Sequence, residues 1–157
     1  MKKALVAYFS ASGVTAGLAK RLAEAIGAEA GEIVPAQVYS AADLDWTNAK
    51  SRSSVEMNDR SCRPAIASSP SPDGCDTVFV GFPVWWYREP SIIDTYMEAH
   101  DFSGKTVVPF AASGGSGIGN AGANMQALAP GARVAGGKKW NASASAAELA
   151  AWAKEYL

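Results

Sequence analysis

The sequence predicts an α/β protein in which helices cover both faces of a parallel sheet. Apolar runs of strand length alternate along the chain with segments whose apolar residues recur at three- and four-residue spacing. This alternation is typical of parallel sheets, because a crossover, usually a helix, must join each parallel strand to the next. The 157 residues suffice for one sizeable core. Without an internal repeat or linker, we expect residues 1–157 to form a single domain.

The first half of the chain contains two expected strands, one expected helix and a long irregular segment. Residues 3–9 form the first strand, and a helix follows from near Val14 to a C-cap at Gly27. Residues 32–34 are expected to form a short second strand. From residue 35 to residue 73 the periodicity is weak, although residues 41–57 have room for one or two helices. Such a segment is usually functional or covers another part of the molecule.

The second half continues the alternation of strands and helices. Residues 76–82 are expected to form the third strand, and a helix over residues 90–98 begins with proline. The fourth strand covers residues 105–110 and is followed by a helix over residues 118–128. Residues 132–134 make a weak fifth strand. Ser145 is expected to cap a last helix that runs to the C-terminus.

Three short loops follow the first, third and fourth strands. The carboxyl ends of parallel strands lie at one edge of a sheet, where ligands bind. Loops that meet there can close on one ligand. The candidate binding residues are Ser10, Ser12, Gly13, Val14 and Thr15 in the first loop, Pro83, Val84, Trp85, Trp86 and Tyr87 in the second, and Ser113, Gly114, Gly115, Ser116 and Gly117 in the third.

The first loop has the chemistry of a phosphate site. A helix N-terminus supplies free N–H groups and a partial positive charge. Ser10, Ser12 and Thr15 add hydroxyl donors, and Gly13 permits a tight turn. The loop has no lysine, so a monophosphate fits better than a nucleoside triphosphate. The alternative is that these residues only form a turn and cap the helix.

The second and third loops suit a flat ligand. The second places three aromatic side chains in succession where a chain normally turns polar, and the third exposes backbone through its glycines. The alternatives are that the aromatic residues pack into the core or under residues 35–73, and that the third loop only leads into its helix. Together the three loops fit a phosphorylated planar ring.

Composition excludes several other classes of function. The net charge is −1 with no long basic run, so we expect neither nucleic acid nor membrane as a partner. His100 is the only histidine, which argues against a zinc site and a Ser-His-Asp triad, and we assign no metal and no catalytic residue. Cys62 and Cys75 are interpreted as free thiols, with a disulfide as the alternative. Polar residues begin at Ser10, too early for a signal peptide, so we expect a cytoplasmic protein.

Taken together, these residues resemble the flavodoxin family. The run Tyr8-Phe9-Ser10-x-Ser12-Gly13-x-Thr15 is similar to the flavodoxin phosphate loop. Asp45-Trp46, Ser51-Arg52-Ser53 with Glu56, Pro83-x-Trp85-Trp86 and the glycine-rich run from Ser113 to Gly119 are similar to a bacterial flavodoxin-like subfamily. The resemblance spans nearly the whole chain. It implies a five-stranded sheet of order 2-1-3-4-5 and FMN held non-covalently, with the first loop on the phosphate and the other two on the isoalloxazine ring.

The resemblance favours a flavodoxin-type electron-transfer protein, with a redox partner protein. The alternatives are a small FMN-dependent NAD(P)H:quinone-type reductase with a quinone-like acceptor, which leaves open whether the protein is an enzyme, and a flavin-free binding module. Two departures from the family are Val14 at a position where asparagine is common, and near-neutrality where electron carriers are strongly acidic. We expect a monomer or weak dimer.

Four further expectations concern side chains around the ring. Trp85 or Trp86 should contact the ring while the other is partly in the core. Residues 35–73 should cover the flavin edge with Trp46 as their apolar anchor. Arg52 should pair with a carboxylate such as Glu56, four residues away. Arg88 should either reach the pyrimidine edge of the ring or point to solvent and pair with Glu89.

Overall fold

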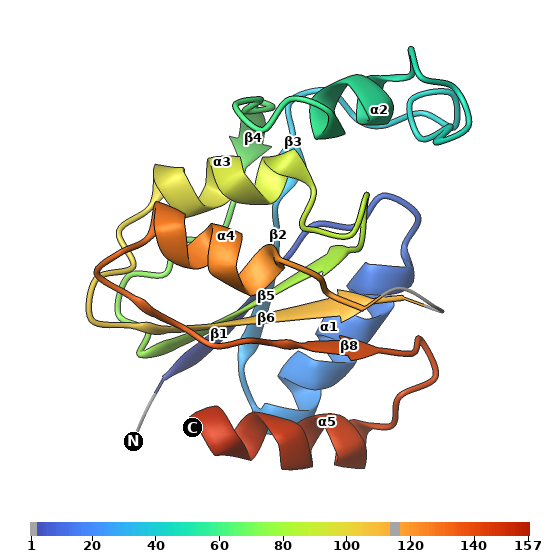
Figure 1. The fold of residues 1–157 in the computed structure, drawn as a ribbon. Helices are drawn as coiled ribbons and strands as arrows, with labels where there is room; N and C mark the ends of the chain where they lie inside the picture. The colour runs from blue at the N-terminus through green and yellow to red at the C-terminus, as the bar shows by residue number, and fades with distance from the viewer. Residues whose placement is uncertain (1–2, 114–116) are drawn as a thin grey trace.

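A central parallel sheet organises the molecule, in a computed structural model that describes residues 3–113 and 117–157 (Figure 1). Its strands β2 (Glu29–Glu32), β1 (Ala4–Tyr8), β5 (Thr77–Pro83), β6 (Thr106–Ala112) and β7 (Arg133–Val134) lie in that order. The expected order 2-1-3-4-5 is therefore confirmed. The fifth position is shared, because β8 (Lys138–Trp140) pairs with the carboxyl-terminal half of β6 while β7 pairs with its beginning.

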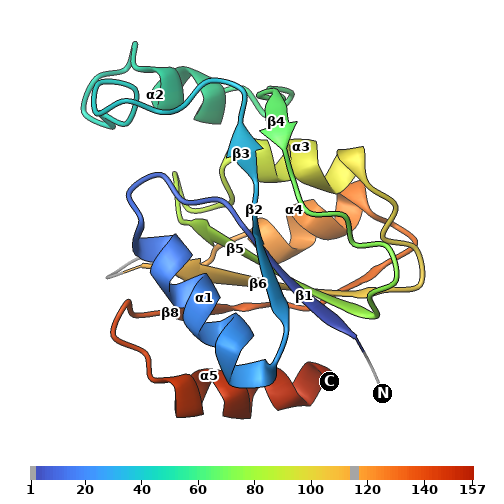
Figure 2. The same cartoon turned by 180° about the vertical axis from the view of Figure 1, so that it is seen from behind.

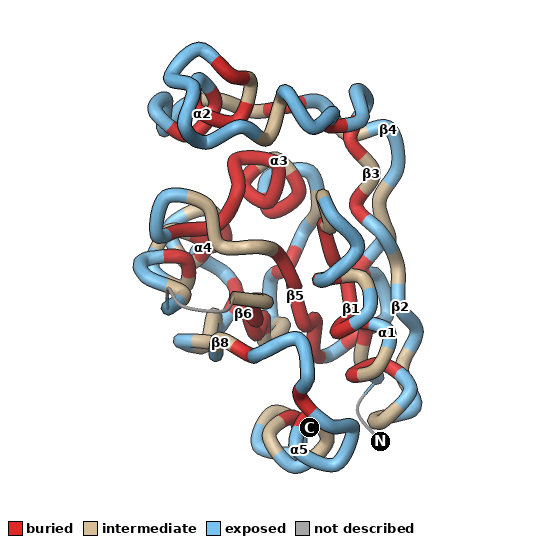
Figure 3. The backbone as a smooth tube through the Cα atoms, turned by 90° about the vertical axis from the view of Figure 1, so that its right-hand side faces the viewer, coloured by how far each residue is buried: buried red, intermediate tan, exposed pale blue. Residues whose placement is uncertain are grey.

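Helices cover both faces of this sheet, as expected. Helices α1 (Val14–Ile26) and α5 (Ala146–Ala153) lie on one face, and α3 (Ser91–Ala99) and α4 (Ala121–Leu128) lie on the other (Figures 1 and 2). Each face has its own cluster of buried apolar side chains. Figure 3 shows the buried backbone concentrated on the inner strands and on α3. The inner strands that lead to the three loops are therefore packed on both faces.

Two expected helix caps are confirmed in detail. Gly27 adopts a left-handed conformation with φ of 68° and its N–H donates to the last turn of α1. Ser145 forms a reciprocal capping box with Glu148 at the start of α5. A short 3-10 helix, η1 (Lys154–Tyr156), then continues α5 to the end of the chain.

The prediction of the second strand was wrong in its boundaries. The strand is Glu29–Glu32, not residues 32–34, and it pairs with β1 at the sheet edge. Three of its four residues are exposed, so it has no apolar run that marks it as a strand. Val34–Pro35 instead forms β3, which pairs antiparallel with β4 (Ile66–Ser68) in a separate two-stranded sheet. Ile33, between them, is fully buried.

Residues 35–73, called the cover segment below, extend past α3 beyond the carboxyl edge of the sheet (Figures 1 and 2). The span 41–57 contains one helix, α2 (Arg52–Met57), whose N-cap is the Ser51 side chain. Cys62 and Cys75 are free thiols. Within residues 3–113 and 117–157, no helix has the length and apolar character needed to cross a membrane.

Candidate functional site

The carboxyl ends of β1, β5 and β6 bring the three loops to one edge of the sheet. The second and third loops touch there: a side chain at Gly119, which has φ of 61°, would place its Cβ 1.8 Å from the Tyr87 carbonyl oxygen. Ser113 is held to the end of β8 by its N–H, which donates to the Trp140 carbonyl at 3.0 Å. The predicted residues Gly114, Gly115 and Ser116 lie outside the described residues.

The first loop leaves the N-terminus of α1 without a cap. Gly13 occupies the N-cap position with φ of 91°, no side chain caps the helix, and its first turn contains no acidic residue. The first-turn N–H groups therefore keep their capacity to bind an anion. Ser10 has a structural part in this arrangement, because its Oγ accepts from the Gly13 N–H at 3.0 Å and closes the turn.

A cavity of about 250 Å³ lies beside this helix end. No aspartate, glutamate, lysine, arginine or histidine is among its lining residues, which are Ser12, Val14, Thr15, Pro83, Ala112, Ser113, Asn141 and Ala142. Sequence reasoning missed Asn141 and Ala142, which follow the unpredicted strand β8. Arg21 of α1 holds this stretch by donating to the carbonyls of Ala142 and Ala144 at 3.0 and 2.8 Å. The direction of the Arg21 side chain could not be predicted from the sequence.

The second loop is a two-residue hairpin turn with an unusual backbone. Trp85 and Arg88 exchange two backbone hydrogen bonds of 3.1 Å around Trp86 and Tyr87. These two residues have φ of 48° and 62°, a left-handed conformation that normally selects glycine or asparagine. Such conformations cost on the order of 1–3 kcal/mol each and persist only where surrounding contacts impose them.

The aromatic side chains of this turn divide between core and surface. Trp85 makes edge-to-face contacts with Phe9 and Tyr39, at centroid distances of 5.6 and 5.4 Å. Trp86 and Tyr87 remain 37% and 74% exposed. Trp85 is thus the partly buried tryptophan that the sequence predicted, and Trp86 and Tyr87 are free to contact a ligand.

The cover segment and the second loop enclose a second cavity of about 480 Å³. Its lining contains no aspartate, glutamate, lysine, arginine or histidine and consists of Leu44, Trp46, Ser53, Val84, Trp85, Trp86 and Tyr87. Trp46, expected as the apolar anchor of the cover segment, lines this cavity with its side chain 75% exposed. Leu44 was missed because no periodic pattern marks it, and Ser53 was noted only within the Ser51-Arg52-Ser53 motif of the resemblance, not as a site residue.

Tyr39 anchors the cover segment to the second loop. It is buried, its hydroxyl donates to Glu56 Oε1, and the Arg52 guanidinium lies 3.8 Å from its ring centroid. Burial, together with the hydrogen bond to Glu56, raises the pKa of Tyr39. The expected Arg52–Glu56 pair is confirmed at 3.0 Å. Helix α2 is thereby connected through Tyr39 to Trp85.

Neither expectation for Arg88 is correct. The side chain is buried and donates to the backbone carbonyls of Glu89 and Met57, each at 3.1 Å. It points under α2 and toward Asp94 of α3, away from both solvent and the two cavities. Burial lowers the pKa of Arg88. The Arg88 guanidinium, which was expected near the bound ring, therefore supports the backbone of the second loop.

Comparison with known proteins gives a consistent result. The sequence model of the family described as Flavodoxin matches residues 3–156. A putative flavoprotein from Bacteroides eggerthii is 46% identical over 99% of this chain and 98% of its own, with a TM-score of 0.92. One from Bacteroides uniformis is 49% identical over 98% of both chains, with a TM-score of 0.90.

A more distant structural match is a Lactobacillus acidophilus flavoprotein in complex with FMN. It is 22% identical over 88% of this chain and 93% of its own, with a TM-score of 0.68, which shows that the two share a fold. No curated protein matches the chain.

Proposed function

This chain belongs to the flavodoxin family, and we propose that it binds FMN non-covalently and serves as a flavodoxin-type electron-transfer protein. Bound FMN would supply one- and two-electron redox chemistry at the sheet edge. The observation that carries this proposal is the pair of cavities on either side of one loop. Pro83 lines the cavity at the helix N-terminus and Val84 lines the aromatic cavity. One ligand with a phosphate and a ring could thus occupy both.

The phosphate would be held by the first loop. The uncapped N-terminus of α1 offers backbone donors, and Ser12 and Thr15 line the same cavity with hydroxyl groups. Because no lysine or arginine lines it, binding there depends on hydrogen bonds and the helix dipole rather than on a paired cation. Gly13 keeps the approach free of a side chain, and Ser10 maintains the turn.

The ring would be held by Pro83 to Tyr87 and by Ser113 and Gly117, with Gly114, Gly115 and Ser116 proposed on the sequence alone. Trp86 and Tyr87 supply exposed aromatic surface next to Val84. Trp85, packed on Phe9 and Tyr39, supports the turn from below. The strained backbone at Trp86 and Tyr87 fits a loop shaped by its ligand contacts.

A direct test is to titrate FMN into flavin-free protein and follow tryptophan fluorescence and the visible flavin spectrum. The proposal expects saturation at one FMN per chain with quenching of tryptophan emission. A spectrum identical to that of free FMN, with no quenching at protein concentrations above ~100 μM, would rule the proposal out.

A reductase is the second candidate, and the aromatic cavity favours it. A volume of about 480 Å³ with uncharged walls is compatible with a small planar acceptor such as a quinone beside the ring. The carrier is expected to show no NAD(P)H oxidation and to be reduced in two separate one-electron steps during stepwise dithionite titration. Quinone-dependent NAD(P)H oxidation, together with reduction in a single two-electron step, would instead identify the protein as a reductase.

A further inference from the structure

A cluster of three charged side chains is buried beneath the end of the second loop. Arg88 and Glu89 end the loop, Asp94 lies in the first turn of α3, and Glu89 and Asp94 are only 0% and 2% exposed. Arg88 Nη1 lies 3.7 Å from Asp94 Oδ2. Asn124 of α4 donates to Glu89 Oε1 at 2.9 Å. The cluster therefore joins the second loop to both helices of one sheet face.

Two carboxylate oxygens in this cluster have no donor. Glu89 Oε2 and Asp94 Oδ1 are buried without a hydrogen-bond partner among the described residues. The two acids are close enough for a side-chain hydrogen bond with each other, but such a bond requires a proton on one of them. With both acids ionised, the three buried side chains would carry a net charge of −1, and an unbalanced buried charge is expensive. One bound proton makes the cluster neutral and gives one acid an O–H that it can donate to the other.

We propose that Glu89 and Asp94 share one proton at neutral pH and act as positioning residues for the second loop. The effect of this proton on FMN binding rests on the proposed function, whereas the shared proton itself does not. Burial and the neighbouring Glu89 raise the pKa of Asp94, while Arg63 and Arg88 oppose the shift.

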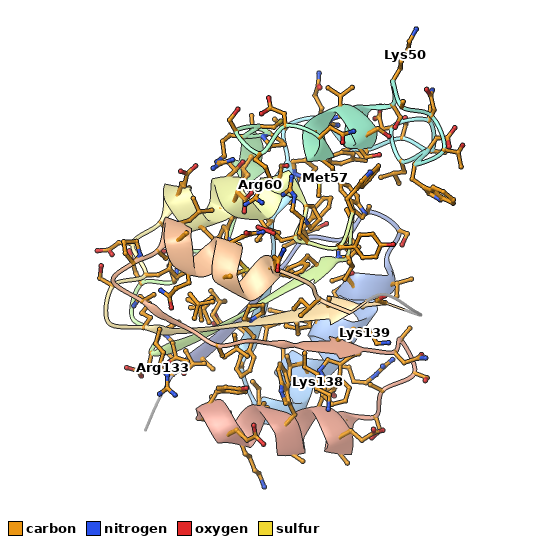
Figure 4. All side chains as sticks on the ribbon, viewed as in Figure 1. Lys50, Met57, Arg60, Arg133, Lys138 and Lys139 are labelled. Atoms are coloured by element: carbon orange, nitrogen blue, oxygen red, sulfur yellow. The ribbon has the colours of Figure 1, made fainter. Side chains whose placement is uncertain are left out.

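The other charged groups that face the pair come from the cover segment and from α3. Arg63 Nη1 lies 3.9 Å from Asp94 Oδ2, and Arg63 also pairs with Glu98 of α3. Arg60 acts on Arg88 through its positive charge. Figure 4 labels Met57, whose carbonyl accepts from Arg88, and Arg60 where the cover segment meets α3. These arginines moderate the repulsion between the acids but do not supply the missing donor.

The shared proton acts on the loop through the backbone of Arg88 and Glu89. The Arg88 N–H and carbonyl close the hairpin turn with Trp85, and the Arg88 side chain is fixed between Met57 and Asp94. Loss of the proton would leave two carboxylates in contact and push Glu89 away from α3. The turn that holds Trp86 and Tyr87 in a left-handed conformation would then lose part of its support.

Asp94→Asn tests this proposal because the amide keeps a donor toward Glu89 but cannot titrate. The measurements are the infrared carbonyl band of protonated carboxyl groups and tryptophan fluorescence, both on flavin-free protein from about pH 6 to about pH 10. In the native protein, one protonated-carboxyl band should disappear with rising pH while the fluorescence changes in parallel. The FMN dissociation constant should rise about tenfold across the same transition, which corresponds to ~1.4 kcal/mol. Asp94→Asn should keep the neutral-pH affinity and show none of these transitions.

Glu89→Gln provides a second donor-bearing variant if Asp94→Asn does not fold, and the same loss of titration is expected. His100→Gln, at the C-terminus of α3, is the control and should leave the transition unchanged. The proposal is overturned if the native protein shows no titrating carboxyl band, if fluorescence does not follow it, or if Asp94→Asn retains the transition. Absence of FMN binding at every pH would refute the proposed function. The infrared and fluorescence measurements on flavin-free protein would still test whether Glu89 and Asp94 share a proton.

Discussion

The two cavities at the carboxyl edge of the sheet are built in different ways. The phosphate-side cavity depends on backbone: an uncapped helix end, a left-handed glycine and a turn closed by one hydroxyl. The aromatic cavity depends on side chains from distant parts of the sequence, because Trp85 is held by Tyr39, and Tyr39 by Glu56 and Arg52. Substitutions on the first side should therefore change ligand affinity with little effect on stability. Substitutions on the second side should change both.

The largest expected effect separates two adjacent tryptophans. Trp85→Ala should lower the free energy of unfolding by about 3–5 kcal/mol, because it removes a large side chain packed on Phe9 and Tyr39. Trp86→Ala should change stability by less than about 1 kcal/mol, yet remove most of the FMN-induced quenching of tryptophan fluorescence. Chemical unfolding and FMN titration measure the two effects. Equal destabilisation by both changes would show that the turn does not divide between core and surface.

The second prediction is a pH dependence confined to the aromatic side. Burial and Glu89 raise the pKa of Asp94 to about 8. The folded state therefore binds this proton more tightly than the unfolded state, so stability should fall as pH rises toward 8, by at most about 1.4 kcal/mol per pH unit. Urea unfolding between about pH 5 and about pH 8 should show a flatter profile for Asp94→Asn than for the native protein. Parallel profiles would contradict the raised pKa.

The third prediction concerns the phosphate side. Ser12→Ala and Thr15→Ala should each weaken FMN binding by roughly 10- to 150-fold, since a hydrogen bond to a charged group is worth about 1.5–3 kcal/mol. The pH profile of stability should not change. Ser103→Ala, before β6 at the opposite edge of the sheet, is the matched control and should leave the affinity unaltered. Unchanged affinity in both the Ser12 and the Thr15 variant would show that these hydroxyls do not bind the phosphate.

The smallest effect is expected at the cover segment. Arg52→Met removes the ion pair with Glu56 and the cation over Tyr39, and should lower stability by about 1 kcal/mol. Lys50→Met is the control, because Lys50 points away from the molecule (Figure 4). Thermal unfolding of both variants provides the comparison. Identical midpoints would mean that α2 does not support the aromatic cavity.

The same contrast explains what could be predicted from the sequence. The turn at Gly13, the caps at Gly27 and Ser145 and the Arg52–Glu56 pair depend on residues close together in the chain, and all were predictable. At the sheet edge, β7 was predicted within residues 132–134, but the bounds of β2 and the existence of β8 were not, because β2 is largely exposed and β8 begins with two lysines.

Contacts between distant segments were the hardest to predict. The role of Tyr39 in the cover segment was not predicted, because it depends on packing against Phe9 and Trp85. The direction of Arg88 is set by the Met57 carbonyl and by Asp94, which belong to two other elements. Such choices depend on tertiary geometry that no local pattern encodes.

The most direct test of the central claim is the ratio of FMN to riboflavin affinity, measured by titration calorimetry under identical conditions. Both ligands carry the same ring, so the ratio isolates the phosphate side of the site. If the uncapped end of α1 and its hydroxyls hold a phosphate, riboflavin should bind at least about 100-fold more weakly, which corresponds to ~2.7 kcal/mol of lost charge-assisted hydrogen bonds. Equal affinities would contradict the account.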